Sequence, residues 1–471
     1  MKIYNTLTRT KETFVPQTPG EVRIYSCGVT PYDLSHVGHA RSVVVFDIIC
    51  RYLAFRGYRV TFVRNYTDVD DKIIRRAQRD GVTASEISER FIREFRADMR
   101  ALGVLPPPPA IAYHDPRATD FVPEMVELVQ RLVERGFAYV VDGDAYFEIA
   151  RFPRYGRLSG KNLDELLAGA RVDVDERKRD PRDFALWKAA KPGEPSWPSP
   201  WGPGRPGWHI ECSVMAMHYL GESFDIHGGG ADLIFPHHEC EIAQSEAATS
   251  RPFARYWVHN GLVNLGAEKM SKSLGNFPTI RELTQRHRAD VFRLWSLGTH
   301  YRSPVEWSED RLPESARALE RFTRLFHDVQ TFWTGAGAAP ALPDDLQAFG
   351  RRFGEAMDDD FNTPQARGVL FDLSHALYER RERAHGDAEA RAELVAGVEE
   401  LRRLGGALGL FQAGHEATGP PPGITALVDE REDARRRRDW QRSDRLREEI
   451  HRLGWQVEDT AAGPRVTRRS P

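Results

Sequence analysis

Two histidines flank a Val-Gly pair in the sequence HVGH (His36–His39), which follows a predicted strand and opens a predicted helix. The first turn of a helix offers unpaired N–H groups and a partial positive charge, and both favour a bound phosphate. Gly38 would let a phosphate or an adenine approach the backbone closely. The imidazoles of His36 and His39 could then donate hydrogen bonds to a phosphoryl group as negative charge develops on it. By itself the motif is also consistent with surface or helix-capping histidines.

A second motif, KMSKS, lies in the glycine-flanked segment Gly266–Asn276 and contains Lys269 and Lys272, two of the nine lysines of this chain. Lysines on a glycine-bounded loop suit a leaving pyrophosphate, which carries several negative charges. Alone, the pentamer could equally be a solvated basic turn. The two motifs stand in this order about 230 residues apart across an α/β pattern, and the pair favours a phosphate-binding site over two unrelated surface features.

Four further residues have the ligand types of a zinc site. They are Cys27, Cys212, His237 and Glu241. His237 and Glu241 are four residues apart, so they share one face of a predicted helix that Pro236 can start. His238 and Cys240 are rival ligands that point away from that face. Cys27 and Cys212 are far apart in the sequence. Their spacing therefore leaves open a second interpretation, in which they are buried structural thiols and His237 and Glu241 are polar residues of a helix surface.

These side chains need a scaffold, and the N-terminal sequence predicts one. Glu21–Gly28 has the pattern of a buried strand, His36–Phe55 has helical apolar spacing, and Tyr58–Asn65 is a second strand. Strand, helix and strand in about 45 residues form a right-handed crossover, the first unit of a doubly wound sheet. Ligands of such sheets bind beyond the carboxyl ends of the strands, here Cys27–Asp33 and Asn65–Asp71.

The whole chain is predicted to be an α/β protein in which a doubly wound, parallel-sheet nucleotide-binding catalytic domain carries an insertion. An α-helical bundle and a small C-terminal α+β module follow it. The predicted boundaries are 1–116 for the first half of the catalytic fold, 117–205 for the insertion, 206–307 for the second half with the KMSKS loop, 308–412 for the bundle, 413–423 for a linker and 424–471 for the module.

Composition narrows the class of protein. The 471 residues are 41% hydrophobic and 29% charged, which excludes collagen-like and disordered chains. Apolar runs fall far short of the ~18 residues of a membrane-spanning helix, so we expect no membrane. The net charge of -3 means that any nucleic-acid surface is local. Four cysteines in this length, with no signal-peptide pattern, predict reduced thiols in a cytoplasmic protein.

At the level of motifs, HVGH followed by KMSKS resembles the pair found in class I aminoacyl-tRNA synthetases. Longer stretches resemble the cysteinyl-tRNA synthetase family from about Tyr4 to Arg469, with Val37 where isoleucine is commoner. They are CGVTPYDLSHVGHAR, NYTDVDDKII, GWHIECS, DIHGGGADLIFPHHECEIAQSEA and EKMSKSLGNF. The resemblance implies ligation of L-cysteine to tRNA(Cys) through a cysteinyl-adenylate, with Mg²⁺ on the ATP phosphates and with His36, His39, Lys269 and Lys272 as the catalytic residues.

The resemblance also implies roles for other residues. The family's zinc ligands map onto Cys27, Cys212, His237 and Glu241 one for one, and a zinc ion suits this substrate because it binds thiolate far better than hydroxyl. ATP would contact His36, Gly38, His39 and Lys272. The implied cysteine-binding residues are Gly28, Thr30, Thr67, Trp208, His227 and Asp232. The enzyme is expected to be a monomer.

The C-terminal segment Arg431–Ile450 is predicted to be one helix, and it places Trp440 among arginines. An aromatic ring beside guanidinium groups suits stacking on unpaired RNA bases, and Asp444 lies one turn further along the helix, where it could contact a base edge. A solvated charged helix has the same composition. The resemblance implies that Arg435, Trp440, Asp444 and Asp459 contact the anticodon.

Two alternative functions stay open. A related ligase could activate cysteine in the same way and transfer it to a small amino sugar, but such a ligase is expected to lack a module like Ile424–Pro471. A non-catalytic RNA-binding paralogue would have no need of both intact phosphate-binding motifs. Acceptor assays separate the first alternative, and cysteine-dependent exchange of pyrophosphate into ATP excludes the second.

Overall fold

The computed structural model describes residues 1–160, 177–264, 278–330, 340–384, 386–412, 422–460 and 463–468. The chain forms two compact units. The first comprises Met1–Ile280, Leu297–Trp307 and Arg351–Val369, and the second comprises Arg281–Ser296, Ser308–Gly350 and Leu370–Pro471. Within the described residues, no helix combines the length and the apolar character that a bilayer-spanning segment requires.

A five-stranded, wholly parallel sheet forms the centre of the first unit. Its strands, in spatial order, are β11 (Ala254–Asn260), β10 (Phe224–Gly230), β3 (Glu21–Val29), β4 (Arg59–Tyr66) and β5 (Ile111–His114). The chain winds outward from β3 in one direction and from β10 in the other, which confirms the predicted doubly wound fold. The carboxyl ends of β3 and β10 therefore flank the crevice where ligands of such sheets bind.

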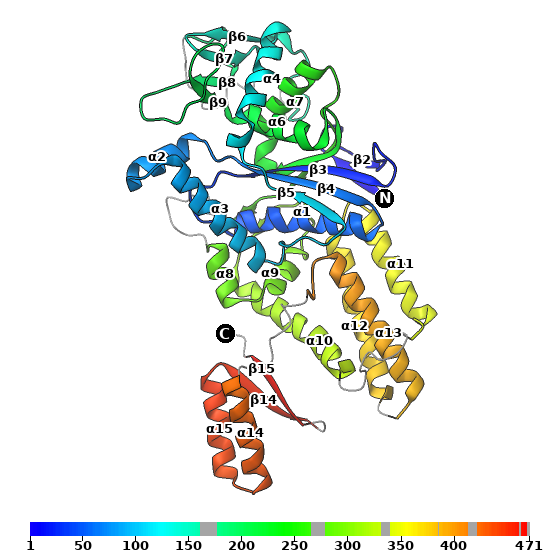
Figure 1. Ribbon diagram of the computed structural model, residues 1–471. Helices are drawn as coiled ribbons and strands as arrows, with labels where there is room; N and C mark the ends of the chain where they lie inside the picture. Colours follow the sequence, from blue (N-terminus) through cyan, green and yellow to red (C-terminus); the bar gives the residue numbers. More distant parts are fainter. Residues whose placement is uncertain are drawn as a thin grey trace. The chain divides into compact units, whose positions relative to one another are not determined.

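Helices cover both faces of this sheet. The helix α1 (Val37–Phe55) lies against one face, and α6 (Trp208–Leu220) lies against the other (Figure 1). Val43–Phe46 and Ile48–Cys50 of α1 are all buried, because this helix is enclosed on most of its circumference. Two of its buried charges are paired with each other, since Arg51 Nε lies 2.8 Å from Asp47 Oδ2 one turn away.

The insertion folds as a small antiparallel sheet of four strands with a helix, α4 (Val122–Glu134). The strands are β6 (Ala138–Val141), β7 (Asp144–Phe147), β8 (Phe184–Ala189) and β9 (Gly204–Pro206). Phe147 and Trp187 are fully buried, and their core continues into the buried residues of α6 and α7 (Glu239–Thr249). The insertion therefore packs against α6, which carries Cys212, and against α7, which carries Glu241. His237 lies in the turn just before α7.

Other elements of the first unit are shorter or lie at its edge. They are β1 (Lys2–Asn5), β2 (Thr10–Thr13), α2 (Asp71–Asp80), α3 (Ala84–Ala101), the 3-10 helices at Ala118–Phe121, Ile149–Arg151 and Ala231–Leu233, the π-type turn Ile234–His238, β12 (Val263–Asn264) and β13 (Val305–Glu306). The sequence pattern of Tyr256–Asn264 favours a single strand, but the segment contains the end of β11 and, after a break, β12. The strand β11 ends at Asn260, and the next residue, Gly261, packs so closely on the backbone of Ser303 that a Cβ would lie 2.3 Å from it; β12 then pairs with β13.

The second unit is helical apart from one hairpin. Its elements are α8 (Ile280–Arg286), α9 (Ala289–Ser296), a 3-10 turn (Glu309–Arg311), α10 (Leu312–Gln330), α11 (Asp344–Asp358), α12 (Thr363–Ala384), α13 (Ala388–Ala407), α14 (Pro422–Arg436), α15 (Trp440–Arg452), β14 (Trp455–Thr460) and β15 (Gly463–Arg468). Residues 351–369, at the end of α11 and the start of α12, belong to the first unit. Leu319, Phe322 and Phe326 of α10 are buried at helical spacing, as expected for a bundle.

The single helix predicted for Arg431–Ile450 is two helices, α14 and α15. The chain turns between them at Arg438, whose φ of 61° is left-handed, and Asp439 caps α15 by accepting a hydrogen bond from the Arg442 N–H at 3.0 Å. Neither glycine nor proline marks this turn in the sequence, which is why helical spacing alone missed it. Trp440 is consequently the first residue of a helix and not a mid-helix residue.

Candidate active site and metal centre

The four candidate metal ligands meet below the crevice between β3 and β10. Cys27 comes from β3 and Cys212 from α6, while His237 and Glu241 come from the turn before α7 and from α7 itself. The two sulfur atoms are 3.6 Å apart, Cys27 Sγ is 3.3 Å from Glu241 Oε1, and His237 Nε2 is 2.8 Å from the same oxygen. All four donor atoms lie within 4.8 Å of one another.

This donor set fits a soft divalent cation. Two thiols, an imidazole and a carboxylate are the ligand types of zinc sites, and the measured separations are those of atoms that one ion could bridge. Cys212, His237 and Glu241 are buried, whereas Cys27 is partly exposed. Cys27 is thus the one ligand of the four whose residue keeps some solvent exposure.

The rival ligand His238 belongs to a second group. Its donor atom lies within 4.8 Å of donor atoms of Cys27, His227 and Glu241. His227 Nε2 is 2.6 Å from Glu241 Oε2, and His238 Nδ1 is 2.8 Å from His259 Nε2. Glu241 thus contacts an imidazole with each carboxylate oxygen, and buried histidines surround the centre on the side of β10 and β11.

The other rival, Cys240, points elsewhere. Its sulfur lies 3.2 Å from the hydroxyl of Tyr155 and is buried in the core that joins α7 to the insertion. Burial raises the pKa of this thiol well above its usual value. It packs as an apolar residue, which agrees with its predicted orientation away from the His237 face.

The two facing thiols have opposite acid–base properties. Burial, and then the hydrogen bond to Cys212, raise the pKa of Cys27 well above the usual value. Burial also opposes ionisation of Cys212, but the hydrogen bond from Cys27 and the neighbouring His237 outweigh it and lower the pKa of Cys212 to about 6. The first negative charge of the pair therefore resides on Cys212.

The Glu241 carboxylate adds a second negative charge beside Cys212, and the neighbouring histidines determine how strongly it is held. Burial disfavours an ionised Glu241, yet His227 and His237 hold its pKa well below the usual range. Burial disfavours a charged His237, but the Glu241 carboxylate raises its pKa to about 10. His209, whose Nδ1 lies 2.9 Å from His237 Nδ1, has a pKa lowered to about 3 by burial. A thiolate and a carboxylate thus face a region where a cation would be stabilised.

Three of the six predicted cysteine-binding residues have defined contacts close to the ligands: Gly28, Thr67 and Trp208. Gly28 and Thr67 lie against Asn65, whose Oδ1 accepts from the Gly28 N–H at 2.9 Å and whose Nδ2 donates to Thr67 Oγ1 at 3.3 Å. Trp208 is 41% exposed and stacks on His237, with 4.3 Å between ring centroids.

The other three predicted cysteine-binding residues, His227, Thr30 and Asp232, differ in their exposure to solvent. His227 is fully buried and contacts Glu241. Thr30 is partly exposed at the end of β3, and Asp232 is exposed in the turn that follows β10.

The HVGH motif begins α1 as a helix cap. His36 is the N-cap, its Nδ1 accepts from the Gly38 N–H at 3.1 Å, and His39 Nδ1 accepts from the His36 N–H at 3.2 Å. The capping interpretation is therefore correct, and it does not exclude phosphate chemistry. A neutral imidazole that accepts at Nδ1 carries its proton on Nε2, which is a donor. The cap thus sets which nitrogen of each ring can donate.

Lys269 and Lys272 lie outside the described residues, but the segment that follows them is anchored to HVGH. The Ile280 N–H donates to the Ser35 carbonyl at 2.9 Å, and the Val37 N–H donates to the Pro278 carbonyl at 3.3 Å. His36 also forms an isolated bridge with Thr279. The chain that leaves the KMSKS segment therefore lies at the N-terminus of α1.

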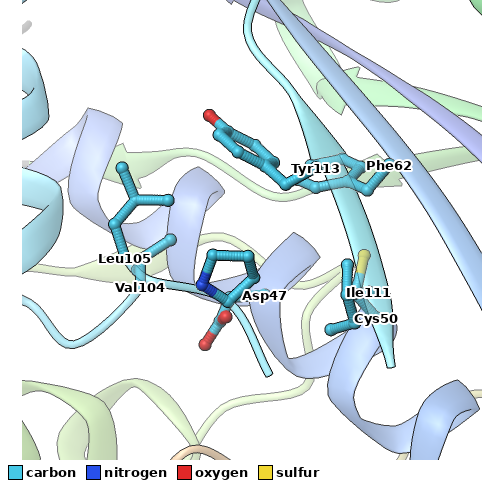
Figure 2. A pocket seen from close by; sticks show the side chains of 8 residues that line it. Asp47, Cys50, Phe62, Val104, Leu105, Ile111 and Tyr113 are labelled. Carbon is cyan, nitrogen blue, oxygen red and sulfur yellow. The ribbon is translucent and has the colours of Figure 1, made fainter. Parts of the chain in front are cut away.

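A small pocket lies away from this site, between α1 and the strands β4 and β5. It is lined mainly by apolar groups, with Phe62, Val104, Ile111 and Tyr113 among them (Figure 2). Its one thiol, Cys50, is buried, and burial raises its pKa far above the usual value. We assign this pocket no chemistry.

In the C-terminal module, three of the four predicted anticodon-binding residues lie together. The Arg435 guanidinium is 5.8 Å from the Trp440 ring centroid, and its Nη1 is 3.1 Å from Asp459 Oδ2. Trp440 is 57% exposed, and Asp444 is exposed one turn further along α15. Arg431, which the sequence did not single out, is buried and holds both oxygens of Asp459 at 2.9 Å.

Comparison with known proteins assigns the chain to a family. Residues 13–317 match the model of the class I (C) tRNA synthetase catalytic domain, 352–412 match the DALR domain, and 417–465 match the cysteinyl-tRNA ligase anticodon binding domain. The chain is 52% identical to the cysteine–tRNA ligase of Geobacter sulfurreducens over 481 residues, which cover 98% of each protein. The chain belongs to the cysteine–tRNA ligase family.

Further relatives agree with this family. The cysteine–tRNA ligase of Alkalilimnicola ehrlichii is 52% identical over 472 residues, again covering 98% of each chain. A solved structure of methionyl-tRNA synthetase from Mycobacterium tuberculosis, in complex with methionyl-adenylate, is similar in fold with a TM-score of 0.62. It shares 16% identity over 82% of this chain and 91% of its own. The resemblance seen in the sequence is confirmed, as is the class of enzyme.

Three residues beside the cluster were not predicted from the sequence as site residues. Asn65 and His209 contact predicted site residues directly, and Glu211 is a buried acid that precedes Cys212. Burial, followed by the charge of Cys212, raises the pKa of Glu211 well above the usual value. The available signals were the position of Asn65 at a strand end and the place of the other two beside Trp208 and Cys212 in the sequence.

Proposed function

We propose that this enzyme, which joins L-cysteine to tRNA in an ATP-dependent reaction, does so in two steps and selects cysteine through one zinc ion per chain. The ligands would be Cys27, Cys212, His237 and Glu241. The observation that carries the proposal is the convergence of their four donor atoms within 4.8 Å from four separate elements. Bound zinc would supply a soft Lewis acid that prefers a thiolate to a hydroxyl.

Selection of cysteine through a metal ion would overcome the weak discrimination that side-chain packing provides. Serine and alanine are nearly the size of cysteine, and packing against one small group discriminates by only ~1–3 kcal/mol. Cys27 is the ligand residue that keeps some solvent exposure, and the exposed Trp208 stacks on His237. A substrate side chain entering here would therefore meet a centre whose donors are already aligned.

The adenylation step would take place at the N-terminus of α1. The cysteine carboxylate attacks the α-phosphorus of ATP, and pyrophosphate leaves. His36 and His39 would donate from Nε2 to the phosphoryl oxygens, and Gly38 would let the nucleotide approach. Lys269 and Lys272, with Mg²⁺, would hold the departing pyrophosphate, and Ile280, which follows them in the chain, is bonded to Ser35. In the second step a hydroxyl of the terminal adenosine of the tRNA attacks the cysteinyl carbonyl, and AMP leaves.

The tRNA would be held by the helical bundle and the C-terminal module. Trp440 is exposed beside Arg435, and a ring of this kind can stack on an unpaired anticodon base. The amino-sugar alternative is disfavoured because residues 417–465 match an anticodon-binding domain. The four cysteines are free thiols, which suits the cytoplasm, and the monomeric state stays a prediction.

The test combines two assays on the purified full chain. Cysteine-dependent exchange of pyrophosphate into ATP measures the first step, with serine as the matched competitor. Transfer of labelled cysteine to tRNA, with an amino sugar in a parallel reaction, measures the second. Metal analysis should find one zinc per chain. Exchange that serine supports as well as cysteine, or a chain without tightly held metal, would refute zinc-based selection.

A further inference from the structure

The strands β3 and β4 are out of register at the point where the metal centre begins. Ser26 pairs with Arg64 and Val29 pairs with Tyr66, so Cys27 and Gly28 stand opposite the single residue Asn65. This is a β-bulge, an extra residue that bends one strand and changes the direction of its side chains. Bulges occur next to active sites for this reason. Here the bulge contains a candidate metal ligand.

The side chain of Asn65 closes the bulge. It is only 1% exposed, and its Oδ1 accepts from the Gly28 N–H at 2.9 Å, a bond that regular pairing would have supplied from the backbone. The same oxygen lies 3.7 Å from Cys212 Sγ, and Nδ2 donates to Thr67 Oγ1 at 3.3 Å. One amide thus links β3, β4 and α6.

The backbone of Asn65 is also in close contact with the bulge. A Cβ on Gly28 would lie 1.6 Å from the Asn65 carbonyl oxygen, so only glycine fits there. The Thr67 N–H donates to the Val29 carbonyl at 3.1 Å, which holds the two strands together just beyond the bulge. Without the amide, the Gly28 N–H loses its acceptor, and the register that directs Cys27 loses its support.

We propose that Asn65 is a positioning residue for the metal centre and the cysteine pocket. It acts through Gly28 on the direction of Cys27, and through Thr67 on the pocket wall. The proposal rests on the zinc-dependent function above. It assigns Asn65 no contact with the nucleotide, because the phosphate-binding motif lies on α1.

The experiment uses Asn65→Ala in the full chain and measures zinc affinity directly, by competition with a chromogenic chelator. Residues that orient metal ligands usually contribute 10–100-fold to affinity, so we expect a loss of about that size. The KM for cysteine in pyrophosphate exchange should rise, while the KM for ATP should stay within about twofold. A merely structural residue would not separate the two substrates in this way.

Two further variants keep the test decisive. Asn65→Asp retains an oxygen acceptor for the Gly28 N–H and should recover zinc affinity to within a few-fold of wild type. The matched control is Asn5→Ala, since Asn5 is also 1% exposed and its Oδ1 accepts from the Leu7 and Trp257 N–H groups at 3.1 and 3.0 Å. This control should lower thermal stability and leave zinc affinity unchanged.

The outcomes distinguish this proposal from the one on which it rests. If wild type binds zinc tightly and Asn65→Ala binds it equally well, the positioning role is refuted. Equal losses in Asn65→Ala and Asn5→Ala would also refute it, since the effect would then be general destabilisation. If wild type itself lacks tight zinc, the proposed function fails first.

Discussion

The sharpest test of the site is the addition of one methyl group at Gly28. The Cβ of Gly28→Ala would lie 1.6 Å from the Asn65 carbonyl oxygen, whereas real Cβ contacts essentially never fall below 3.0 Å. The obstacle is backbone and cannot rotate away. The two strands must therefore separate by about 1.4 Å, the difference between these distances.

Cys27 is the neighbouring residue, so its sulfur must move by a similar amount. Functional groups have to be held within roughly 0.5 Å of their productive geometry, and a displacement near 1 Å costs about 100-fold. We expect Gly28→Ala to bind zinc about 100-fold more weakly and to lose cysteine-dependent pyrophosphate exchange to a similar degree. The overpacking should also cost about 1–3 kcal/mol of folding stability.

The assay measures zinc per chain after dialysis against a chelator, together with exchange at saturating ATP. Gly368→Ala is the control, because a Cβ there meets nothing within 4 Å on the helix α12. It should keep full zinc and gain slightly in stability. A folded Gly28→Ala protein with one zinc and an unchanged KM for cysteine would refute the argument that the bulge directs Cys27.

Three other outcomes are expected. Cys212→Ser should lose bound zinc and cysteine activation together, measured by metal analysis and exchange, and retention of both would remove Cys212 from the ligand set. Trp440→Ala should weaken tRNA charging by the ~1–3 kcal/mol of one stacked base without changing pyrophosphate exchange, and equal loss in both assays would contradict a tRNA role. The hydrogen bond from Arg431 lowers the pKa of Asp459, so its contribution to module stability is complete above the unfolded pKa of about 4 and disappears as pH falls through the lower folded value. The protection of residues 422–460 against hydrogen exchange, corrected for the intrinsic rate, should therefore fall at acid pH, and this fall should be absent in Asp459→Asn.

Much of the central fold was predictable, because local periodicity determines its elements. Glu21–Gly28 and Tyr58–Asn65 were predicted as strands and form β3 and β4 with ends shifted by one residue. The helix predicted to start at His36 begins at Val37. The predictions failed where an element ends beside residues that are distant in the sequence. The break after Asn260 depends on the backbone of Ser303, which no local pattern can reveal.

In the candidate site, too, the sequence predicts relations between neighbouring residues but not between distant ones. Helical spacing alone relates His237 to Glu241, because four residues make about one turn. It cannot relate Cys27 to Cys212, which are 185 residues apart and meet only because the helix α6 packs against the strand β3. The choice between His237 and His238 is also tertiary, since both lie near Glu241 and differ in what else surrounds them.

The sequence by itself determined the family, the motifs and the identity of the donor groups, since these depend on residue types and on order along the chain. Only the tertiary structure decided that the donors converge, that Asn65 supports the bulge beneath Cys27, and that the histidines of HVGH cap α1 through Nδ1. The physical reason is that coordination and hydrogen bonding depend on separations of a few ångströms between segments that the chain brings together only when it folds.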